Sequence, residues 1–332
     1  MIRLAVIDVG DRCHEYFATL PRLHDTRITT VVDPDAIAAK RLCSQLGAQT
    51  AARSWNELST ADIQSFDAVV VHTPLVAEEA SRRCEVVCRA AAAGKHVMVD
   101  TPLADSSAEA ERAFAACKSA GVHLMVGQPL RFMPYQRTVR ESLDAGKLGT
   151  PGLLRIHHWH ADDVDSTNGK VHQAIMGLII REVDVACWLF AGVPDFIYAK
   201  ALSDDTPQRG LQLHLGFPVG GMALIDCTRT LPARSDTYYS LTLIGSTGAA
   251  YADDHHNTNL LLRGDVVGLT VDQGRDHFAL QLQEFVDAVR YDRVPNGTGE
   301  DGKRAIEVAQ AAIDSMESHR AAKLVGDRYE LC

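Results

Sequence analysis

The chain has 332 residues, enough for about two domains at roughly 150 residues each and for a sizeable buried core. Hydrophobic residues make up 46% and charged residues 23%, with 24 Gly and 12 Pro, a composition that excludes disordered and fibrous proteins. The 33 Lys and Arg residues are outnumbered by 43 Asp and Glu residues, which gives a formal net charge of -10. No basic run is longer than a pair, so we expect no binding to nucleic acid.

Neither secretion nor membrane insertion is expected. The start of the chain, MIRLAVIDVG, lacks the charged segment, the long apolar segment and the cleavage site of a signal peptide. No stretch approaches the roughly 20 apolar residues that span a bilayer. The 8 cysteines include no CxxC pair, and Cys84 and Cys88, on one face of an expected helix, are interpreted as core residues. We therefore expect reduced thiols and a cytoplasmic protein.

In the first part of the chain, short apolar runs alternate with helical patterns. The expected strands are residues 3–9, 27–33, 67–72, 96–100 and 123–127. The expected helices are residues 12–22, 36–46, 77–93 and 107–120. Gly94 follows the third of these helices as its C-cap. Strict alternation of this kind predicts a parallel, doubly wound sheet.

The pattern changes at the breaker cluster Gly149-Thr150-Pro151-Gly152, after which strands dominate. The expected strands are residues 153–160, 196–202, 212–217, 221–228, 238–244, 249–253 and 260–262. The expected helices are residues 174–190, 276–291 and 301–322. Because most strands follow one another without an intervening helix, the second part is predicted to form a large, mostly antiparallel open sheet within an α/β domain.

Ligands of open parallel sheets bind beyond the carboxyl ends of the strands, so the residues after each strand are informative. The sequence DVGDRC at positions 8–13 fills only the middle glycine of the pattern G-x-G-x-x-G. Gly10 either lets the backbone approach a pyrophosphate or belongs to a plain turn, and Asp8 and Asp11 place carboxylates where phosphates would lie. Asp33 lies where an acidic group accepts the adenosine ribose hydroxyls, although the segment DPD at 33–35 equally fits a turn with an N-cap.

Several segments together resemble the Gfo/Idh/MocA oxidoreductases, the family of glucose-fructose oxidoreductase and inositol dehydrogenase. They are VVDPD at 31–35, VVVHTP at 69–74, AAGKHVMVDTPLA at 92–104, RFMPYQRTVRESLDAGKLGTPGLLRIHH at 131–158, REVDVACWLFAG at 181–192 and GEDGKRAIEVA at 299–309. The resemblance covers essentially the whole chain. It implies a Rossmann-type dinucleotide-binding domain, residues 1–130, and a C-terminal α/β domain, residues 131–332, whose closing helix packs back on the first. It also implies NAD(P)-linked oxidation of a sugar, cyclitol or similar hydroxy compound.

The chain departs from the family at the residues that transfer protons. The family's Glu-Lys-Pro reads Asp100-Thr101-Pro102, so Thr101 replaces the lysine that holds substrate and nicotinamide. The family's Asp, His and Asp on the interdomain helix read Gly177, Arg181 and Asp184. Histidine is the usual acid or base because its pKa lies near 7, whereas arginine stays protonated and cannot act as an ordinary base. The sequence therefore predicts that the standard hydride chemistry is lost.

Other residues expected near the same site offer substitutes for the lost groups. His172 is either a general base or an exposed loop residue. Arg181 and Arg131 either bind an anionic ligand through bidentate hydrogen bonds or, in the case of Arg181, form a salt bridge with Glu182 or Asp184. We assign possible catalytic roles to His172, Arg181 and Thr101, and substrate contacts to Arg131, His158, His160 and Asp184.

The segment IHHWHADD at 156–163 is rich in metal-ligand residue types. Strand periodicity places His158 and His160 on one face and His157 on the other, so few ligands converge. A polar strand edge that lines the substrate site is preferred, and no metal is expected. For the cofactor we expect contacts from Gly10, Asp33, His72, Pro74, Asp100 and Pro102. Asp33 favours NAD over NADP because its charge repels a 2′-phosphate.

Three functions remain open at this stage. The first is a catalytically silent or repurposed member that binds a sugar, cyclitol or small acid, which the missing Lys, Asp and His favour. The second is an active NAD(P)-dependent oxidoreductase with a rearranged site. The third is a lyase, isomerase or hydrolase that uses the His-rich strand. In each case we expect a small-molecule ligand and a homo-oligomer formed through the C-terminal sheet.

Overall fold

The computed structural model describes residues 1–8, 19, 22–72, 80–161, 171–232, 235, 237–253, 259–263, 268–271 and 277–332. The chain forms two compact units. The first unit contains Met1–Phe132 and Asp276–Ile306, and the second contains Met133–Arg275 and Glu307–Cys332. The sequence prediction assigned all of 131–332 to one domain, whereas 276–306 belong to the first unit in the structure.

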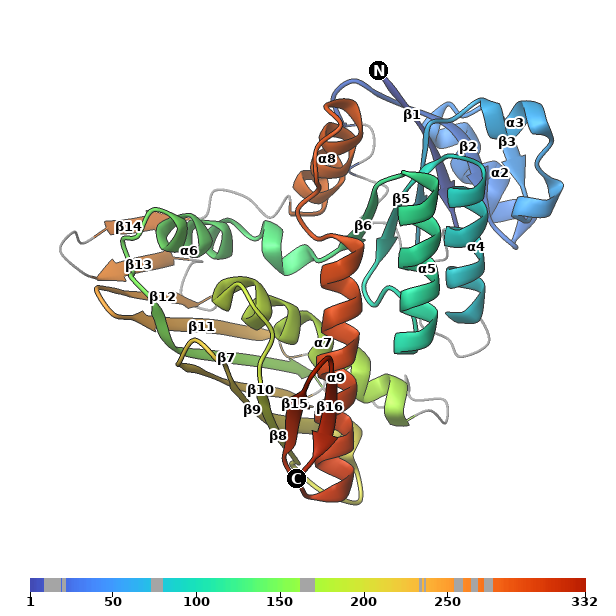
Figure 1. Cartoon of the computed structure of the whole chain (residues 1–332). Helices are drawn as coiled ribbons and strands as arrows, with labels where there is room; N and C mark the ends of the chain where they lie inside the picture. The colour runs from blue at the N-terminus through green and yellow to red at the C-terminus, as the bar shows by residue number, and fades with distance from the viewer. Residues whose placement is uncertain are drawn as a thin grey trace. The chain divides into compact units, whose positions relative to one another are not determined.

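The first unit contains a six-stranded sheet in the order β3-β2-β1-β4-β5-β6, with every pair parallel. Its strands are β1 Ile2–Ile7, β2 Thr26–Val32, β3 Thr50–Ala52, β4 Ala68–Val71, β5 His96–Asp100 and β6 Leu124–Gly127. Its complete helices are α2 Ala36–Leu46, α3 Thr60–Gln64, α4 Ala80–Ala92, α5 Ser107–Ala120 and α8 His277–Arg290. In Figure 1, α4 and α5 lie side by side along the sheet. The predicted doubly wound fold is confirmed.

Local sequence signals account for most of these boundaries. Asp35 accepts hydrogen bonds from the amides of Ile37 and Ala38 and so begins α2, while Gly47, with a φ of 64°, ends it. The bounds predicted for α2, α5 and β5 are those of the structure. The three-residue strand β3 was not predicted because it is too short for a periodic pattern. The expected helix 12–22 falls largely outside the described residues.

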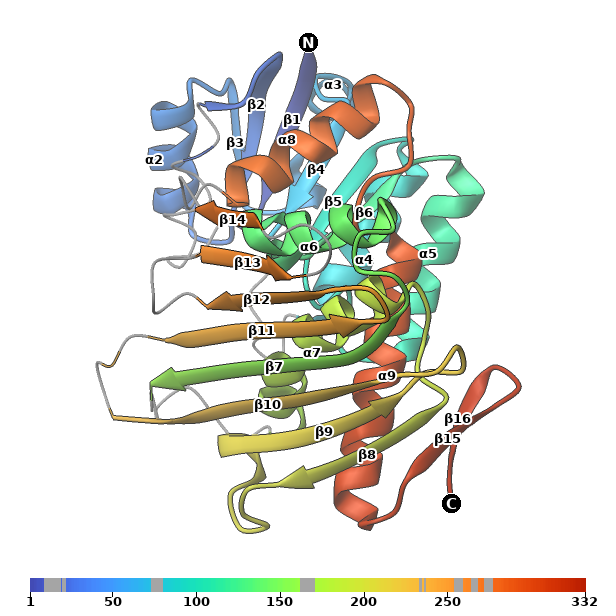
Figure 2. The same cartoon turned by 90° about the vertical axis from the view of Figure 1, so that its left-hand side faces the viewer.

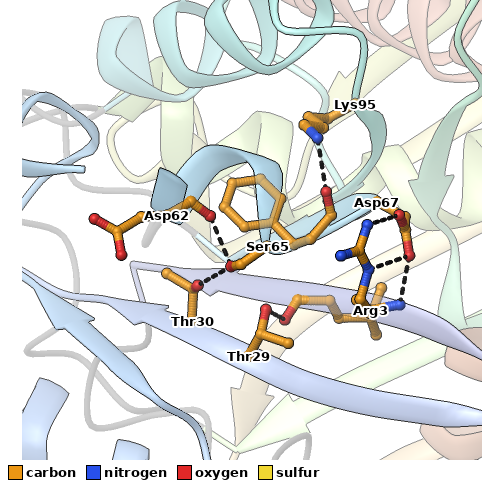
Figure 3. A network of polar contacts seen from close by, with 9 residues as sticks. Arg3, Thr29, Thr30, Asp62, Ser65, Asp67 and Lys95 are labelled. Carbon is orange, nitrogen blue, oxygen red and sulfur yellow. Dashed lines mark hydrogen bonds and ion pairs between the residues drawn. The ribbon is translucent and has the colours of Figure 1, made fainter. Parts of the chain in front are cut away.

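A polar network joins β1 to the segment that leads into β4 (Figure 3). The Arg3 guanidinium donates to both oxygens of Asp67, at 2.6 and 3.1 Å, and the Arg3 amide donates to the same carboxylate at 2.9 Å. Burial raises the pKa of Asp67, but the hydrogen bonds from Arg3 outweigh this effect and the net shift is downward. The Lys95 ammonium donates to the Phe66 carbonyl at 2.7 Å. These contacts hold β1 and β4 together at their amino ends, whereas the ligand is expected at the carboxyl ends of the strands.

The second unit contains a ten-stranded sheet in the order β14-β13-β12-β11-β7-β10-β9-β8-β15-β16 (Figure 2). Its strands are β7 Pro151–Ala161, β8 Phe196–Ala201, β9 Gly210–Gly216, β10 Met222–Leu231, β11 Tyr238–Gly245, β12 Ala249–Asp253, β13 Asn259–Arg263, β14 Gly268–Val271, β15 Ala322–Val325 and β16 Arg328–Leu331. Only β7 and β10 pair in parallel. The predicted large, mostly antiparallel sheet is confirmed.

Helices α6 Pro134–Asp144 and α7 Val171–Phe190 also belong to the second unit, and α9 Gly299–Ser318 runs from the first unit into the second. The sequence did not predict α6, β14 or the hairpin β15–β16. The predicted last helix, 301–322, was too long at its end, because His319 adopts a φ of 55° and Ala322 begins β15. None of the helices in the described segments has the length and apolar character to cross a bilayer.

The ten-stranded sheet has one buried and one partly exposed face. Along β7 the even-numbered residues Leu154, Ile156 and His158 are buried, while Arg155 between them is exposed. Helix α7 packs against β7 and β10. The period-two pattern therefore places the side chains of Leu154, Ile156 and His158 on the side that α7 contacts.

We predict that Gly245 at the end of β11 cannot carry a side chain. A Cβ there would lie 2.0 Å from the Leu148 carbonyl oxygen, so Gly245→Ala should destabilise the protein by about 1–3 kcal/mol. Gly152→Ala is the matched control, because its Cβ would meet only the Ile244 carbonyl at 3.5 Å. Urea unfolding of both variants measures the effect, and equal stabilities would contradict the prediction.

Candidate functional site

The carboxyl ends of the strands in the first unit gather several charged and polar side chains. The sheet order reverses direction between β1 and β4, which is where open α/β sheets bind ligands. Asp8 follows β1, Asp33 follows β2, His72 follows β4 and Asp100 ends β5. Gly10 and Pro74, also expected at this edge, lie outside the described residues.

Asp8 forms an ion pair that closes the end of β1. Its φ is 57°, a left-handed conformation that Asp tolerates better than most residues, and only 3% of the residue is exposed. Its amide donates to the Val32 carbonyl at 2.8 Å, and its Oδ1 accepts from Nη2 of Arg82 on α4 at 2.7 Å. Arg82 therefore offsets the carboxylate that the sequence placed where phosphates would lie.

Asp33 and Asp35 occupy different roles in the turn after β2. Asp33 is 4% exposed and accepts a hydrogen bond from the Asp35 amide at 2.8 Å, whereas Asp35 caps α2. The sequence left open whether this turn supplies a ribose-binding carboxylate or an N-cap. The two roles are compatible, because Asp35 is the cap and Asp33 is a separate carboxylate at the end of β2. A buried carboxylate at the end of β2 suits the hydroxyls of an adenosine ribose.

His72, Asp100 and Arg83 form a second polar group at this edge. The Nδ1 atom of His72 contacts Oδ2 of Asp100, and Arg83 donates to the carbonyl of Pro102. Burial, with a contribution from the charge of Arg83, lowers the pKa of His72 to about 4. Burial also lowers the pKa of Arg83 to about 10. At neutral pH His72 is therefore neutral and Arg83 is charged.

Thr101, which the sequence resemblance sets where a lysine is expected, has a buried hydroxyl group. Its amide donates to the Gly127 carbonyl at 3.2 Å, and its buried Oγ1 has no hydrogen-bond partner within the described segments. Gln128, which directly follows β6, is 1% exposed, and its side-chain amide is likewise unpaired within the part of the chain described. Sequence reasoning missed Gln128, although its place just after a strand was a signal.

Arg131 lies in a network within the first unit. Its side chain is 4% exposed, and Nη1 lies 3.3 Å from Oδ2 of Asp301 and 3.4 Å from Oδ1 of Asn296. Burial raises the pKa of Asp301, but the charge of Arg131 and the hydrogen bonds from Thr298 outweigh it, so the pKa lies below its usual value. These contacts stabilise the buried Arg131 side chain within the fold. The expected role of Arg131 in substrate binding stays a prediction.

A buried polar cluster lies between α7 and the sheet of the second unit. His158 on β7 stands between Cys227 on β10 and Tyr239 on β11 in the strand register. The Nδ1 atom of His158 hydrogen bonds to Oε1 of Glu182 on α7, and these residues are 6% and 1% exposed. The other Glu182 oxygen, Oε2, has no hydrogen-bond partner among the described residues. Sequence reasoning considered Glu182 only as a partner for Arg181.

Burial keeps Cys227 and Tyr239 neutral. It raises the pKa of the Cys227 thiol well above its ordinary value, and the Glu182 carboxylate adds to this shift. Burial likewise raises the pKa of Tyr239, whose hydroxyl accepts from Nε2 of Gln136 at 2.9 Å. Neither side chain is therefore an effective nucleophile or base at neutral pH.

His160 borders this cluster and lies near two cations. Its ring centroid is 4.0 Å from that of His158. Burial lowers the pKa of His160 to about 3, and His158, Arg181 and Arg229 add to the shift. His160 is consequently a neutral hydrogen-bonding group in a region of positive potential.

Helix α7 carries the remaining expected residues. Gly177, Arg181 and Asp184 follow one another at intervals of four and three residues and so lie on neighbouring turns. Asp184 is 1% exposed, and Arg181 is half-buried. Across the described ranges of the chain, Arg181 forms no ion pair, so neither salt bridge considered from the sequence is present. His172, the second residue of α7, is half-buried.

His157 faces the other side of the sheet, as the strand period predicts. It contacts Oδ1 of Asp226, and the Trp159 indole donates to Oδ2 of the same residue at 2.5 Å. No three His, Cys, Asp or Glu side chains are placed to hold a metal ion in the segments that the structure describes. Asp162 and Asp163, considered as further ligands, lie outside those segments.

Comparison with family models covers nearly the whole chain. Residues 2–128 match an oxidoreductase family's NAD-binding Rossmann fold. Residues 136–251 match a GFO/IDH/MocA C-terminal domain, and residues 228–324 match an oxidoreductase C-terminal alpha/beta domain. The first unit thus carries the NAD-binding domain of such proteins.

Curated relatives include two inositol dehydrogenases. Myo-inositol 2-dehydrogenase of Thermotoga maritima is 25% identical over 97% of this chain and 98% of its own length. The NAD(+)-dependent scyllo-inositol 2-dehydrogenase of Bacillus subtilis is 25% identical over 96% of this chain and 94% of its own length. An oxidoreductase from Agrobacterium radiobacter, solved with NAD+, L-tartaric acid and magnesium, has a TM-score of 0.81 at 17% identity, over 97% of this chain and 98% of its own.

The Arg131 network predicts a large effect of removing one charge. Asp301→Asn leaves the buried guanidinium without its carboxylate and should destabilise the protein by about 2–4 kcal/mol. Glu300→Gln is the control, because its pair with Arg304 is exposed and should contribute less than about 1 kcal/mol. Chemical unfolding of both variants measures the free energy of unfolding. Equal losses of this free energy in Asp301→Asn and Glu300→Gln would contradict the prediction.

The lowered pKa of His160 predicts acid sensitivity. In the unfolded chain His160 binds a proton as the pH falls through about 6.5, whereas in the folded protein it stays neutral until about 3. The free energy of unfolding therefore decreases as the pH falls from about 6.5 to about 3. His160→Gln should reduce the loss between about pH 7 and pH 4.5 by about 1–2 kcal/mol.

Urea unfolding of the native protein and the variant at both pH values measures this difference. His214→Gln, at an exposed position on β9, is the control for removing a histidine. A pH dependence that His160→Gln leaves unchanged would contradict the assignment.

Proposed function

Because this chain belongs to the Gfo/Idh/MocA oxidoreductase family, we propose that it is a member whose standard hydride-transfer site has been replaced and which binds a sugar, cyclitol or small acid. Arg181 carries this proposal, since the sequence resemblance aligns this permanently protonated guanidinium with the histidine that acts as acid or base in the family. The same resemblance aligns Thr101 with the family's lysine and Gly177 with its first aspartate. Loss of one such group typically slows proton transfer by about 10² to 10⁴.

The nucleotide end of the first unit fits NAD in the residues described. Asp33 would hold the adenosine ribose through its buried carboxylate, and its charge disfavours a 2′-phosphate. Arg82, whose side chain is 32% exposed, neutralises Asp8 and presents donors near the end of β1. When bound, NAD supplies a hydride acceptor. The proposal is that the groups needed to take the accompanying hydroxyl proton are missing.

An active oxidoreductase with a rearranged site is the second candidate. The hydrogen-bonded pair of His158 and Glu182 and the neutral imidazole of His160 favour it, because a neutral imidazole accepts a proton. A pKa near 3 makes His160 a weak base, however, and His172 is the remaining histidine on α7. The first proposal needs no such base and is therefore preferred.

We also propose that the exposed face of the ten-stranded sheet joins copies of this chain. Four large apolar side chains there or at its margin are 38–49% exposed, namely Phe196, Met222, Ile244 and Tyr251. They come from four different strands, which makes the apolar surface broad. A cytoplasmic location remains a prediction.

An absorbance assay for NADH tests the proposed function. The protein with NAD+ and either myo-inositol, scyllo-inositol, glucose or xylitol should form no NADH above a no-enzyme control. Calorimetry on the same sample should show that NADH binds more tightly than NADPH. A failure to form NADH would then not be due to a failure to bind the cofactor. Formation of NADH that His172→Ala abolishes would overturn the proposal in favour of the rearranged enzyme.

A further inference from the structure

Two cysteines on α4 and an arginine on α5 form a cluster that takes no part in the site described above. Helices α4 and α5 lie side by side in the first unit (Figure 1). Cys84 is fully buried, whereas Cys88, one turn further along α4, is half-buried. The cluster therefore has one thiol in the core and one that solvent reaches.

The two thiols lie close together, because residues at positions i and i+4 are neighbours on one face of a helix. Burial raises the pKa of the Cys84 thiol to about 11, and a hydrogen bond with the Cys88 side chain also contributes to the shift. Two free thiols within reach of each other can serve as two ligands for one ion.

Arg112 on α5 brings a positive charge to this pair. Its Nε donates to Cys84 Sγ at 3.2 Å, and Cys88 Sγ lies 4.0 Å from the Arg112 carbonyl oxygen. The hydrogen bond with Cys84 raises the pKa of Arg112, and the charges of Cys84, Cys88 and Glu109 add to the shift. The guanidinium is thus shared between a carboxylate and the two sulfurs, and it already contacts the sulfur of Cys84.

The arrangement suits an ion that accepts two sulfur ligands. No group of three His, Cys, Asp or Glu side chains is placed to hold a metal within the ranges that the structure describes. Structural zinc sites have four ligands, whereas copper(I) is a soft ion that prefers thiolates and accepts two of them in a line. With metal–sulfur bonds of roughly 2.3 Å, such a pair needs sulfur atoms about 4.6 Å apart, which helix positions with Cβ atoms about 5–6 Å apart can supply.

We propose that Cys84 and Cys88 bind one copper(I) ion as a linear dithiolate, with Arg112 as the counter-charge. Binding releases the two thiol protons, so a singly charged cation and two thiolates form a singly negative complex. A divalent ion would leave the complex neutral, and the guanidinium therefore favours the monovalent ion. The ion reaches Cys88 first, because Cys84 is fully buried. The site is independent of the proposed function, whose residues it does not include.

Competition with the copper(I) chelator bicinchoninate, without oxygen and with the thiols reduced, tests the proposal. The metal-free full chain should take one equivalent of copper(I) from the chelator. Cys88→Ser removes a ligand and should weaken this binding by at least about 100-fold, and Arg112→Gln should weaken it by about tenfold. Cys43→Ser is the matched control, because Cys43 is also half-buried on a helix but donates to the Ala48 carbonyl oxygen, and it should change the affinity less than twofold.

X-ray absorption by the copper-loaded native protein is a second readout that needs no variant, and it should show two sulfur neighbours for each copper. Failure of the native protein to take copper(I) from the chelator overturns the proposal, and so do equal losses in Cys43→Ser and Cys88→Ser. Three or more ligands to copper, nitrogen ligands, or tighter binding of zinc than of copper(I) overturn it as well.

Discussion

The hydrogen bond between His158 and Glu182 is the constraint on which the second unit's site depends. It joins the middle strand of a ten-stranded sheet to the helix that covers it, and both partners are almost completely buried. Breaking this contact would leave the buried Glu182 carboxylate without the one hydrogen bond that the described residues give it, which is costly, so the contact helps to fix the rotation of α7 against β7. The rotation in turn determines which side Arg181 faces and which residues surround His160.

The fold and the proposed site depend on different residues of the chain. The strands of the first unit keep the apolar runs that a buried parallel sheet requires, as the residues of β4 show with 0–1% exposure. The residues on which the proposed loss of chemistry depends lie elsewhere, with Asp8 after β1, Thr101 after β5 and Arg181 on α7. Because fold and chemistry reside in separate residues, the family relationship establishes the architecture and leaves the reaction to the site.

The sequence predicted the elements that local physics determines. Helices α2 and α5 have an N-cap and a terminal glycine, and their bounds were predicted to the residue. The hairpin β15–β16 was missed because each of its strands is four residues long and largely exposed, without a clear alternating pattern.

The site contacts were harder to predict because their partners are distant in sequence. Asp8 and Arg82 lie 74 positions apart, and Arg131 and Asp301 lie 170 apart. Glu182 directly follows Arg181, so a salt bridge between the two was one of the alternatives considered from the sequence. In the structure, Glu182 instead hydrogen bonds to His158, 24 positions away. Only the helix rotation set by tertiary packing decides between these partners.

The most direct test is crystallographic density for the protein at the contact between β7 and α7. We predict that Glu182 is bonded to His158 and that the guanidinium of Arg181 is paired with neither Glu182 nor Asp184. Density that shows Arg181 paired with Glu182 or Asp184 would contradict this prediction.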